Sequence, residues 1–219
     1  MKTTAERQRE ITRSKALVHM LRDRMGETSV YGFASRYDGL MQGTSNTQES
    51  KKWRPVFNGK QPLTARTMAS LSELFPDAPR LHQDGPADLW RAMWGTLEEL
   101  RAIVADDLNA WQSFDVALAE FEADLLLAET YREALTIQHL AKAVALHRLH
   151  HDLLGLDGAG TCRCIRRCLD DEEVQAALRR FAVLDEVRAN LAVIADDPLA
   201  CIPADQRWDA LEKKLDWIN

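Results

Sequence analysis

Residues 46–71 read NTQESKKWRPVFNGKQPLTARTMASL. Two lysines and an arginine surround its tryptophan, an Asn-Gly pair follows, and Pro-Leu-Thr precedes apolar residues at helical spacing. Asn46 and Glu49 have the spacing of a capping box, in which two side chains close the first turn of a helix. The spacing predicts a helix that begins near residue 46, and Asn58-Gly59 predicts its end in a left-handed turn.

This predicted helix has a charged side and an apolar side. The residues that it presents outward include Lys51, Lys52 and Arg54, and those available for packing are Trp53, Val56 and Phe57. Pro55 has no amide hydrogen and would kink or shorten a continuous helix. Alternatively, Pro55 opens a separate turn, and residues 46–54 remain as the exposed helix.

The residues before this stretch predict two supporting helices. The run from Ala5 to Met25 is amphipathic, and Gly26 follows it at a position that favours a helix end. Thr28 or Ser29 can cap a second helix. Residues 38–47 contain two glycines and several small polar residues, which is typical of a loop.

After the quoted stretch, Pro62 and Thr64 mark the start of a further helix that continues to Phe75. Residues 76–86 are rich in Pro, Asp and Gly, and this composition predicts a linker or a domain boundary.

The run from Thr96 to Leu154 contains neither glycine nor proline, and its apolar residues recur in a seven-residue pattern. We expect it to divide near Leu108-Asn109, with a second register from Ile137 to Leu154. An intramolecular helical bundle and a dimerising coiled coil both fit this pattern.

The remaining segments complete an all-α chain. Residues 155–161 predict a turn, Asp170 to Ile194 a helix that begins with acidic residues, and residues 204–218 a terminal amphipathic helix. The expected organisation is therefore a basic helix-turn-helix-like domain over residues 1–78 and an acidic helical bundle over residues 86–219.

Charge is distributed unevenly along the 219 residues, whose formal net charge is −6. Residues 1–75 carry 13 Lys and Arg against 7 Asp and Glu, a net charge of +6, and residues 76–219 carry 15 against 27, a net charge of −12. This asymmetry suggests an anion-binding module joined to an acidic body.

The sequence contains no apolar run long enough to span a membrane and no signal-peptide segment, so we expect a cytoplasmic protein. In a reducing compartment, its four cysteines are expected to be thiols or metal ligands rather than disulfides.

Over residues 28–75 the pattern resembles the lambda-repressor-like (Cro/Xre-type) helix-turn-helix family. Phe33-Ala34 stands for the apolar pair of the scaffold helix, and Asp38-Gly39 begins the turn. Residues 48–57 stand for the recognition helix, and residues 59–64 for the break after it. The resemblance implies a prokaryotic or phage transcriptional regulator that binds double-stranded DNA.

The DNA contacts expected from this resemblance and from side-chain chemistry lie in and after the predicted recognition helix. Lysine and arginine contact phosphates, whereas amide and hydroxyl side chains can read base edges. The candidates are Asn46, Thr47, Gln48, Ser50, Lys51, Lys52, Arg54 and Lys60. The resemblance further implies a homodimer, paired through the carboxy-terminal helices, that engages two half-sites about one DNA turn apart.

A histidine and cysteine cluster is the other feature that could carry chemistry. His147 and His151 share a helix face, and Cys162, Cys164 and Cys168 follow a few residues later. Two imidazoles and two thiolates could hold zinc, but Cys-x-Cys-x-x-x-Cys is not a usual zinc spacing and three arginines crowd the cysteines. Ordinary packing is the favoured interpretation, and no metal or cofactor is expected.

No nucleotide-binding glycine loop, GxSxG, HExxH or kinase signature occurs, and no pair of residues suggests a nucleophile with its base. We therefore expect no enzymatic activity. The competing hypothesis is a helical protein–protein interaction module that binds no nucleic acid and whose basic amino-terminal part docks an acidic protein.

Overall fold

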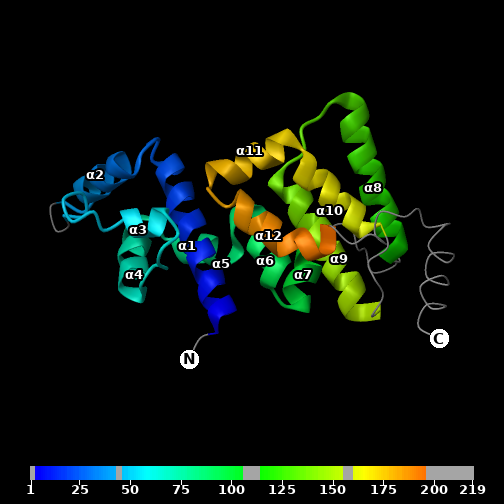
Figure 1. Cartoon of the computed structure of the whole chain (residues 1–219), viewed down its shortest axis with the longest axis horizontal. Helices are drawn as coiled ribbons and strands as arrows, with labels where there is room; N and C mark the ends of the chain where they lie inside the picture. Colours follow the sequence, from blue (N-terminus) through cyan, green and yellow to red (C-terminus); the bar gives the residue numbers. More distant parts are fainter. Residues whose placement is uncertain (1–2, 43–45, 106–113, 155–159, 196–219) are drawn as a thin grey trace. The chain divides into compact units, whose positions relative to one another are not determined.

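The computed structural model describes residues 3–42, 46–105, 114–154 and 160–195, and all regular structure in these ranges is helical (Figure 1). The elements are α1 (Thr4–Arg24), α2 (Val30–Leu40), α3 (Arg54–Phe57), α4 (Ala65–Leu74), α5 (Ala78–Asp84), the 3-10 helix η1 (Pro86–Asp88), α6 (Leu89–Trp94), α7 (Leu97–Ile103), α8 (Phe114–Tyr131), α9 (Ile137–Leu154), α10 (Thr161–Asp170), α11 (Glu172–Arg180) and α12 (Leu184–Ala195). The predicted all-α class is confirmed. None of the helices in the described ranges is long and apolar enough to cross a membrane.

The chain forms two compact units. Unit 1 contains Met1–Trp90 together with Leu178–Glu186, and unit 2 contains Arg91–Ala177 together with the chain from Val187 onward. The linker predicted at residues 76–86 is wrong, because α5 and η1 occupy this stretch. Pro79 and Pro86 lie in the first turns of α5 and η1, where the missing amide hydrogen leaves no hydrogen bond unmade.

Unit 1 is built around α1, which packs against α3 and α5. Its buried core draws on α1, α2, α3 and α4 and includes Leu17, Leu21, Phe33, Tyr37, Trp53, Phe57 and Leu71. Ser14 on α1 ties distant segments together: its Oγ accepts a hydrogen bond from the amide of Leu63 (2.9 Å) and lies 3.1 Å from Nε2 of His82 on α5.

Local sequence signals account for most helix limits in unit 1. α1 ends before Gly26, which has a φ of +73°. Ser29 caps α2 by accepting a hydrogen bond from the amide of Gly32, and Thr64 caps α4 in the same way through the amide of Thr67. Gly59, with a φ of +63°, ends α3 at the predicted place.

The continuous helix predicted from residue 46 to Phe57 is wrong. Residues 47–53 form successive turns, and only Arg54–Phe57 is helical. Lys51 has a φ of +53°, which no α-helical residue adopts. Pro55 lies in the first turn of α3, where its missing amide hydrogen is tolerated, so the alternative in which Pro55 opens its own turn is nearer to the structure.

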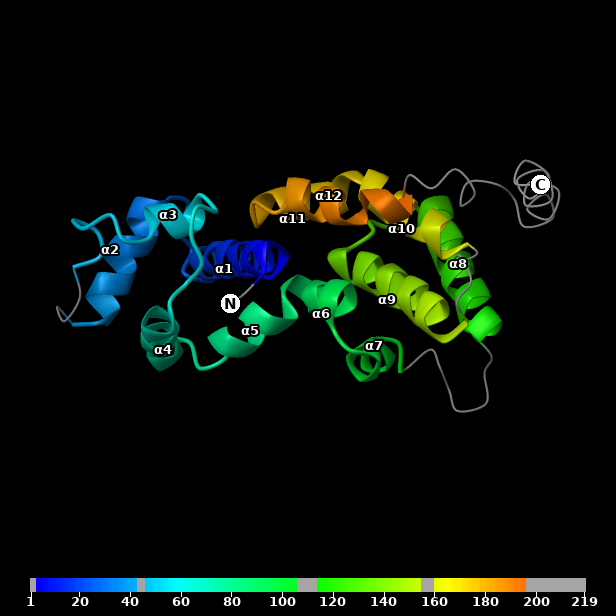
Figure 2. The same ribbon diagram turned by 60° about the horizontal axis from the view of Figure 1, so that its bottom comes forward.

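In unit 2, α9 packs against α7 and α10, and α10 also contacts α8 (Figure 2). The run that we expected to divide only near Leu108-Asn109 is also interrupted after α8, where Arg132 has a φ of +56°. The single helix predicted from Asp170 to Ile194 is also wrong, because Ala182 has a φ of +58° and separates α11 from α12.

Three predicted features lie mainly or wholly outside the described residues. They are the division near Leu108-Asn109, the turn at residues 155–161 and the terminal helix at residues 204–218.

Candidate nucleic-acid interface

The basic loop, which we define as residues 46–54, is held in place by Asp38 on α2. The Oδ1 atom of Asp38 accepts hydrogen bonds from the amide (2.9 Å) and the hydroxyl (2.8 Å) of Thr47. Its Oδ2 atom accepts a hydrogen bond from the amide of Gln48 (2.9 Å). One carboxylate thereby accepts hydrogen bonds from the first backbone amides of the loop, as a capping side chain does at the start of a helix.

Trp53 fixes the other end of the basic loop. Its indole is 1% exposed and stands edge-on to Phe33 (ring centroids 5.2 Å apart) and to Tyr37 (5.0 Å), both on α2. Its Nε1 donates a hydrogen bond to the hydroxyl of Thr47 (2.8 Å). Asp38, Thr47 and Trp53 therefore form one connected network beneath the loop.

The structure divides the predicted DNA contacts into two groups. Asn46, Ser50, Lys51, Lys52, Arg54 and Lys60 are exposed, and Gln48 is half-buried. Thr47 is only 3% exposed, and its hydroxyl is already bonded to Asp38 and Trp53. Thr47 thus positions the loop and does not lie on its surface.

Several basic side chains of α1 are paired with carboxylates of unit 1, whereas exposed Arg7 makes no ion pair among the described residues. Lys15 lies 2.6 Å from Glu186, and Arg24 forms two hydrogen bonds with Asp77, at 2.8 and 3.0 Å. The Arg24 guanidinium holds the pKa of the Asp77 carboxyl below its usual value. These cations are neutralised within the fold.

The cations around the basic loop are not neutralised in this way. Among the described residues, no ion pair is formed by the exposed cations Lys51, Arg54, Lys60 and Arg66. Lys52 lies over the ring of Trp53, with its Nζ 5.5 Å from the centroid. Most of the cations on α1 are therefore paired, whereas several cations around the loop make no ion pair among the described residues.

Two open grooves lie on either side of Trp53. The first, of about 470 Å³, is lined by residues from α2 and the basic loop, among them Tyr31, Gln48, Lys51 and Arg54. The second, of about 420 Å³, is lined among others by Lys52, Gln61, Arg66 and Ser70. We call the surface formed by the two grooves the basic face; Lys60 lies outside both grooves.

The carboxylate of Glu49 adds a negative charge to the otherwise basic first groove. Glu49 lies in the first groove, is exposed, and accepts a hydrogen bond from Nδ2 of Asn46 (2.6 Å). The Asn46–Glu49 pair that suggested a capping box therefore forms, but it joins two side chains across a turn and caps no helix.

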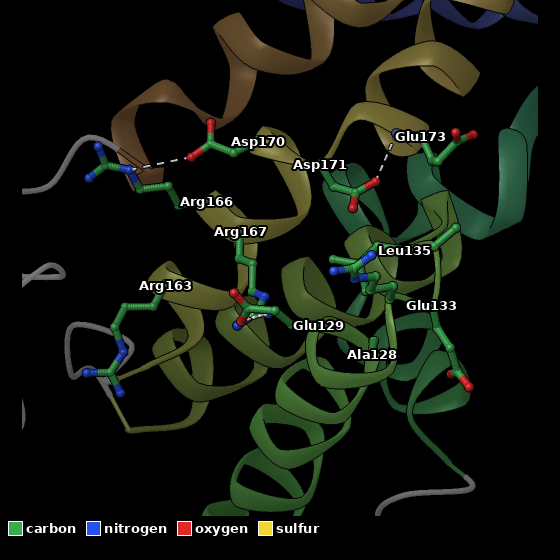
Figure 3. Close-up of a pocket in the computed structure, with 12 residues that line it drawn as sticks. Ala128, Glu129, Glu133, Leu135, Arg163, Arg166, Arg167, Asp170, Asp171 and Glu173 are labelled. Carbon is green, nitrogen blue, oxygen red and sulfur yellow. Dashed lines mark hydrogen bonds and ion pairs between the residues drawn. The ribbon is translucent and has the colours of Figure 1, made fainter.

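A larger opening, of about 960 Å³, lies in unit 2 between the end of α8 and α10 (Figure 3). Its arginines face carboxylates: Arg163 lies 3.0 Å from Glu122, and Arg167 is paired with Glu129. Figure 3 also shows Arg166 directed toward Asp170, at 4.0 Å. The mixture of charges, with most cations already paired, favours neither an anion nor a cation at this opening.

The cysteine candidates are packed into unit 2. Cys162, Cys164 and Cys168 are all buried, and burial raises the pKa of the Cys164 and Cys168 thiols to about 12. His147 Nδ1 lies 3.0 Å from the hydroxyl of Thr161 and 3.7 Å from Sγ of Cys162. Within the described ranges no group of three or more His, Cys, Asp or Glu residues could hold a metal ion, and the side chain of His151 is outside them.

Several residues of the basic face, and the residue that orders the basic loop, are not evident from the sequence. The sequence places Asp38 at the start of a turn, nine positions before Thr47, and gives no local signal of the contact between them. Tyr31 and Arg66 line the two grooves but lie outside the predicted recognition helix. Of these two, the basic composition of residues 1–75 signals Arg66 only.

Comparison of the chain with protein-family models, curated proteins and solved structures gave no match.

Proposed function

We propose that the chain binds double-stranded DNA through the basic face of unit 1 and acts as a transcriptional regulator in the cytoplasm of a prokaryote or in a phage system. The observation that supports this most is the contrast in pairing. Lys15 and Arg24 on α1 are neutralised by carboxylates, whereas the cations around the basic loop make no ion pair among the described residues.

Unpaired cations on one surface suit a phosphate backbone. Each lysine or arginine that neutralises a phosphate releases counterions, which supplies most of the affinity of non-specific DNA binding. Lys51, Lys52 and Arg54 are the cations that we assign to phosphates in the first instance. Asn46, Gln48 and Ser50 carry the amide and hydroxyl groups that can read base edges.

The network beneath the loop supports the same proposal. A flexible loop would lose conformational entropy on binding, and a loop that is already ordered loses less. The bonds of Asp38 to Thr47 and Gln48, together with the buried Trp53 ring, order the loop before any ligand arrives. A short connected loop of turns then takes the place of the longer recognition helix that the sequence suggested.

One copy of unit 1 presents a small contact surface. Pairing of two copies through the carboxy-terminal helices would let them engage two half-sites and would raise affinity by linking two binding events. Light scattering with and without DNA measures the mass of the particle in solution. A monomeric mass in both conditions would contradict the dimer.

The binding proposal is tested by fluorescence anisotropy of a labelled generic duplex at low salt. We expect the wild-type chain to bind and Lys51→Ala/Lys52→Ala to bind about tenfold more weakly, because two phosphate contacts are lost. Arg80→Ala is the control, since Arg80 is an exposed cation of unit 1 that is 3.1 Å from Asp84 and outside both grooves. Failure of the wild-type chain to bind duplex DNA would favour the protein–protein interaction module instead.

A further inference from the structure

Glu49 is an acidic residue in a groove whose other charged side chains are cations. Among the described residues that line the first groove, Lys51 and Arg54 are basic and Glu49 alone is acidic. No ion pair joins Glu49 to a cation anywhere in the described ranges. A carboxylate is repelled by phosphates, so neither charge pairing within the fold nor contact with a DNA backbone accounts for Glu49 at this place.

The carboxylate of Glu49 is held on one side only. Its Oε2 atom accepts a hydrogen bond from Nδ2 of Asn46 (2.6 Å). The backbone at this point is a turn, closed by a hydrogen bond from the amide of Lys51 to the carbonyl of Gln48 (3.3 Å). Within the part of the chain that the structure describes, Oε1 of Glu49 accepts no hydrogen bond. The turn and Asn46 thus position a free acceptor on the exposed surface of the basic loop.

A hydrogen-bond acceptor that approaches the bases of DNA requires a donor. In the major groove the donors are the N4 amine of cytosine and the N6 amine of adenine. The adenine amine lies between two acceptors, N7 of adenine and O4 of the paired thymine, and both repel a carboxylate. The cytosine amine has an acceptor on one side only, the O6 atom of the paired guanine, and the C5–H group of cytosine on the other. A carboxylate is therefore matched to cytosine.

We infer that Glu49 gives the basic face a preference for cytosine, because its carboxylate accepts a hydrogen bond from the N4 amine in the major groove. This inference rests on the proposed binding of duplex DNA and specifies the sequences that the basic face favours. Where no cytosine faces the carboxylate, Glu49 only repels phosphates. The same residue thus lowers affinity for a generic duplex and favours a site in which cytosine is correctly placed.

Fluorescence anisotropy with two labelled duplexes of the same G·C sequence tests the inference. One duplex carries ordinary cytosine, and the other carries N4-methylcytosine, whose methyl group replaces the amine hydrogen that faces the major groove. Base pairs and phosphates are the same in both, so the difference in affinity reports the N4 donor. We expect the wild-type chain to bind the methylated duplex about fivefold more weakly, which is the lower end of what a specific base contact contributes.

Two variants assign this difference to a residue. Glu49→Ala removes the acceptor and should bind the two duplexes with equal affinity. Glu73→Ala is the matched control, because Glu73 is an exposed carboxylate of α4 that lines neither groove, and it should keep the fivefold difference. Each protein is compared with itself on two duplexes, so a change in its folded fraction cancels.

Three results would overturn the inference. Equal affinities of the wild-type chain for the two duplexes would exclude a contact with the N4 amine and leave the proposed DNA binding intact. A fivefold difference that persists in Glu49→Ala would assign the contact to another residue. Failure of the wild-type chain to bind either duplex would contradict the proposed function itself, and the preference for cytosine with it.

Discussion

Asp38 and Thr47 are joined by two hydrogen bonds to the same carboxylate oxygen, from the amide of Thr47 (2.9 Å) and from its hydroxyl (2.8 Å). The second oxygen of Asp38 accepts a hydrogen bond from the amide of Gln48 (2.9 Å). This contact attaches the basic loop to α2. The hydroxyl of Thr47 also accepts a hydrogen bond from the buried indole of Trp53.

Removal of the Asp38 carboxylate should loosen the loop. Asp38→Ala leaves the partly buried Thr47 and Gln48 donors without their acceptor, and we expect unfolding free energy to fall by about 2 kcal/mol. Guanidinium denaturation of the full chain measures this change. Glu73→Ala is the control, because Glu73 is an exposed carboxylate of α4 and its loss should change stability by less than about 0.5 kcal/mol. Equal effects of the two substitutions would show that Asp38 does not order the loop.

Glu49 should weaken DNA binding in the wild-type chain, because its carboxylate shares a groove with Lys51 and Arg54. Glu49→Gln removes the charge and keeps an amide of similar shape, so we expect affinity for a generic duplex to rise about threefold at low salt. Glu73→Gln removes the same charge outside both grooves and should give a smaller gain. A fall in affinity for Glu49→Gln would mean that this groove does not face phosphates.

His19 should make unit 1 sensitive to acid. Its Nε2 donates a hydrogen bond to the carbonyl of Phe57 (3.3 Å), and burial lowers its pKa from 6.5 to about 4. Between these two pH values the unfolded chain binds a proton at His19 that the folded chain does not bind. The stability present above pH 6.5 should therefore decline as pH falls through this window. Thermal unfolding followed by circular dichroism should show a weaker decline for His19→Gln than for the wild-type chain, and identical pH profiles would exclude His19 as the cause.

Replacement of Ala182 by glycine should stabilise the chain. Ala182 has a φ of +58° at the end of α11, where the amide of Val183 donates to the carbonyl of Leu178 (3.0 Å). A residue with a Cβ atom is strained in this left-handed position, whereas glycine is not. We expect Ala182→Gly to stabilise the chain by about 0.5–1 kcal/mol in guanidinium denaturation. A loss of stability would show that the strain is smaller than the added entropy of the unfolded chain.

The same geometry explains which helix ends were predictable. Gly26 and Gly59 end their helices in the left-handed conformation, and glycine is the residue that signals such an end in a sequence. Arg132 and Ala182 adopt the same conformation without that signal. The two helix ends at Arg132 and Ala182 therefore could not be predicted, and the sequence predicted longer helices than the chain forms.

The basic face was predictable only in outline. The charge of residues 1–75 and the burial of Trp53, Val56 and Phe57 follow from local composition and spacing. The conformation of residues 47–53 does not, because it depends on the carboxylate of Asp38, which is distant in sequence. Local spacing suggested a capping box at Asn46 and Glu49, and the contact with Asp38 determined the turns that form instead.

The most direct test of DNA binding by the basic face is the salt dependence of duplex affinity. We expect the logarithm of the association constant to fall linearly with the logarithm of salt concentration. The magnitude of the slope should decrease by about 0.9 for each of Lys51→Ala, Lys52→Ala and Arg54→Ala, and should stay unchanged for Arg80→Ala. Slopes that are the same in all four variants and the wild-type chain would contradict the assignment of this surface to DNA.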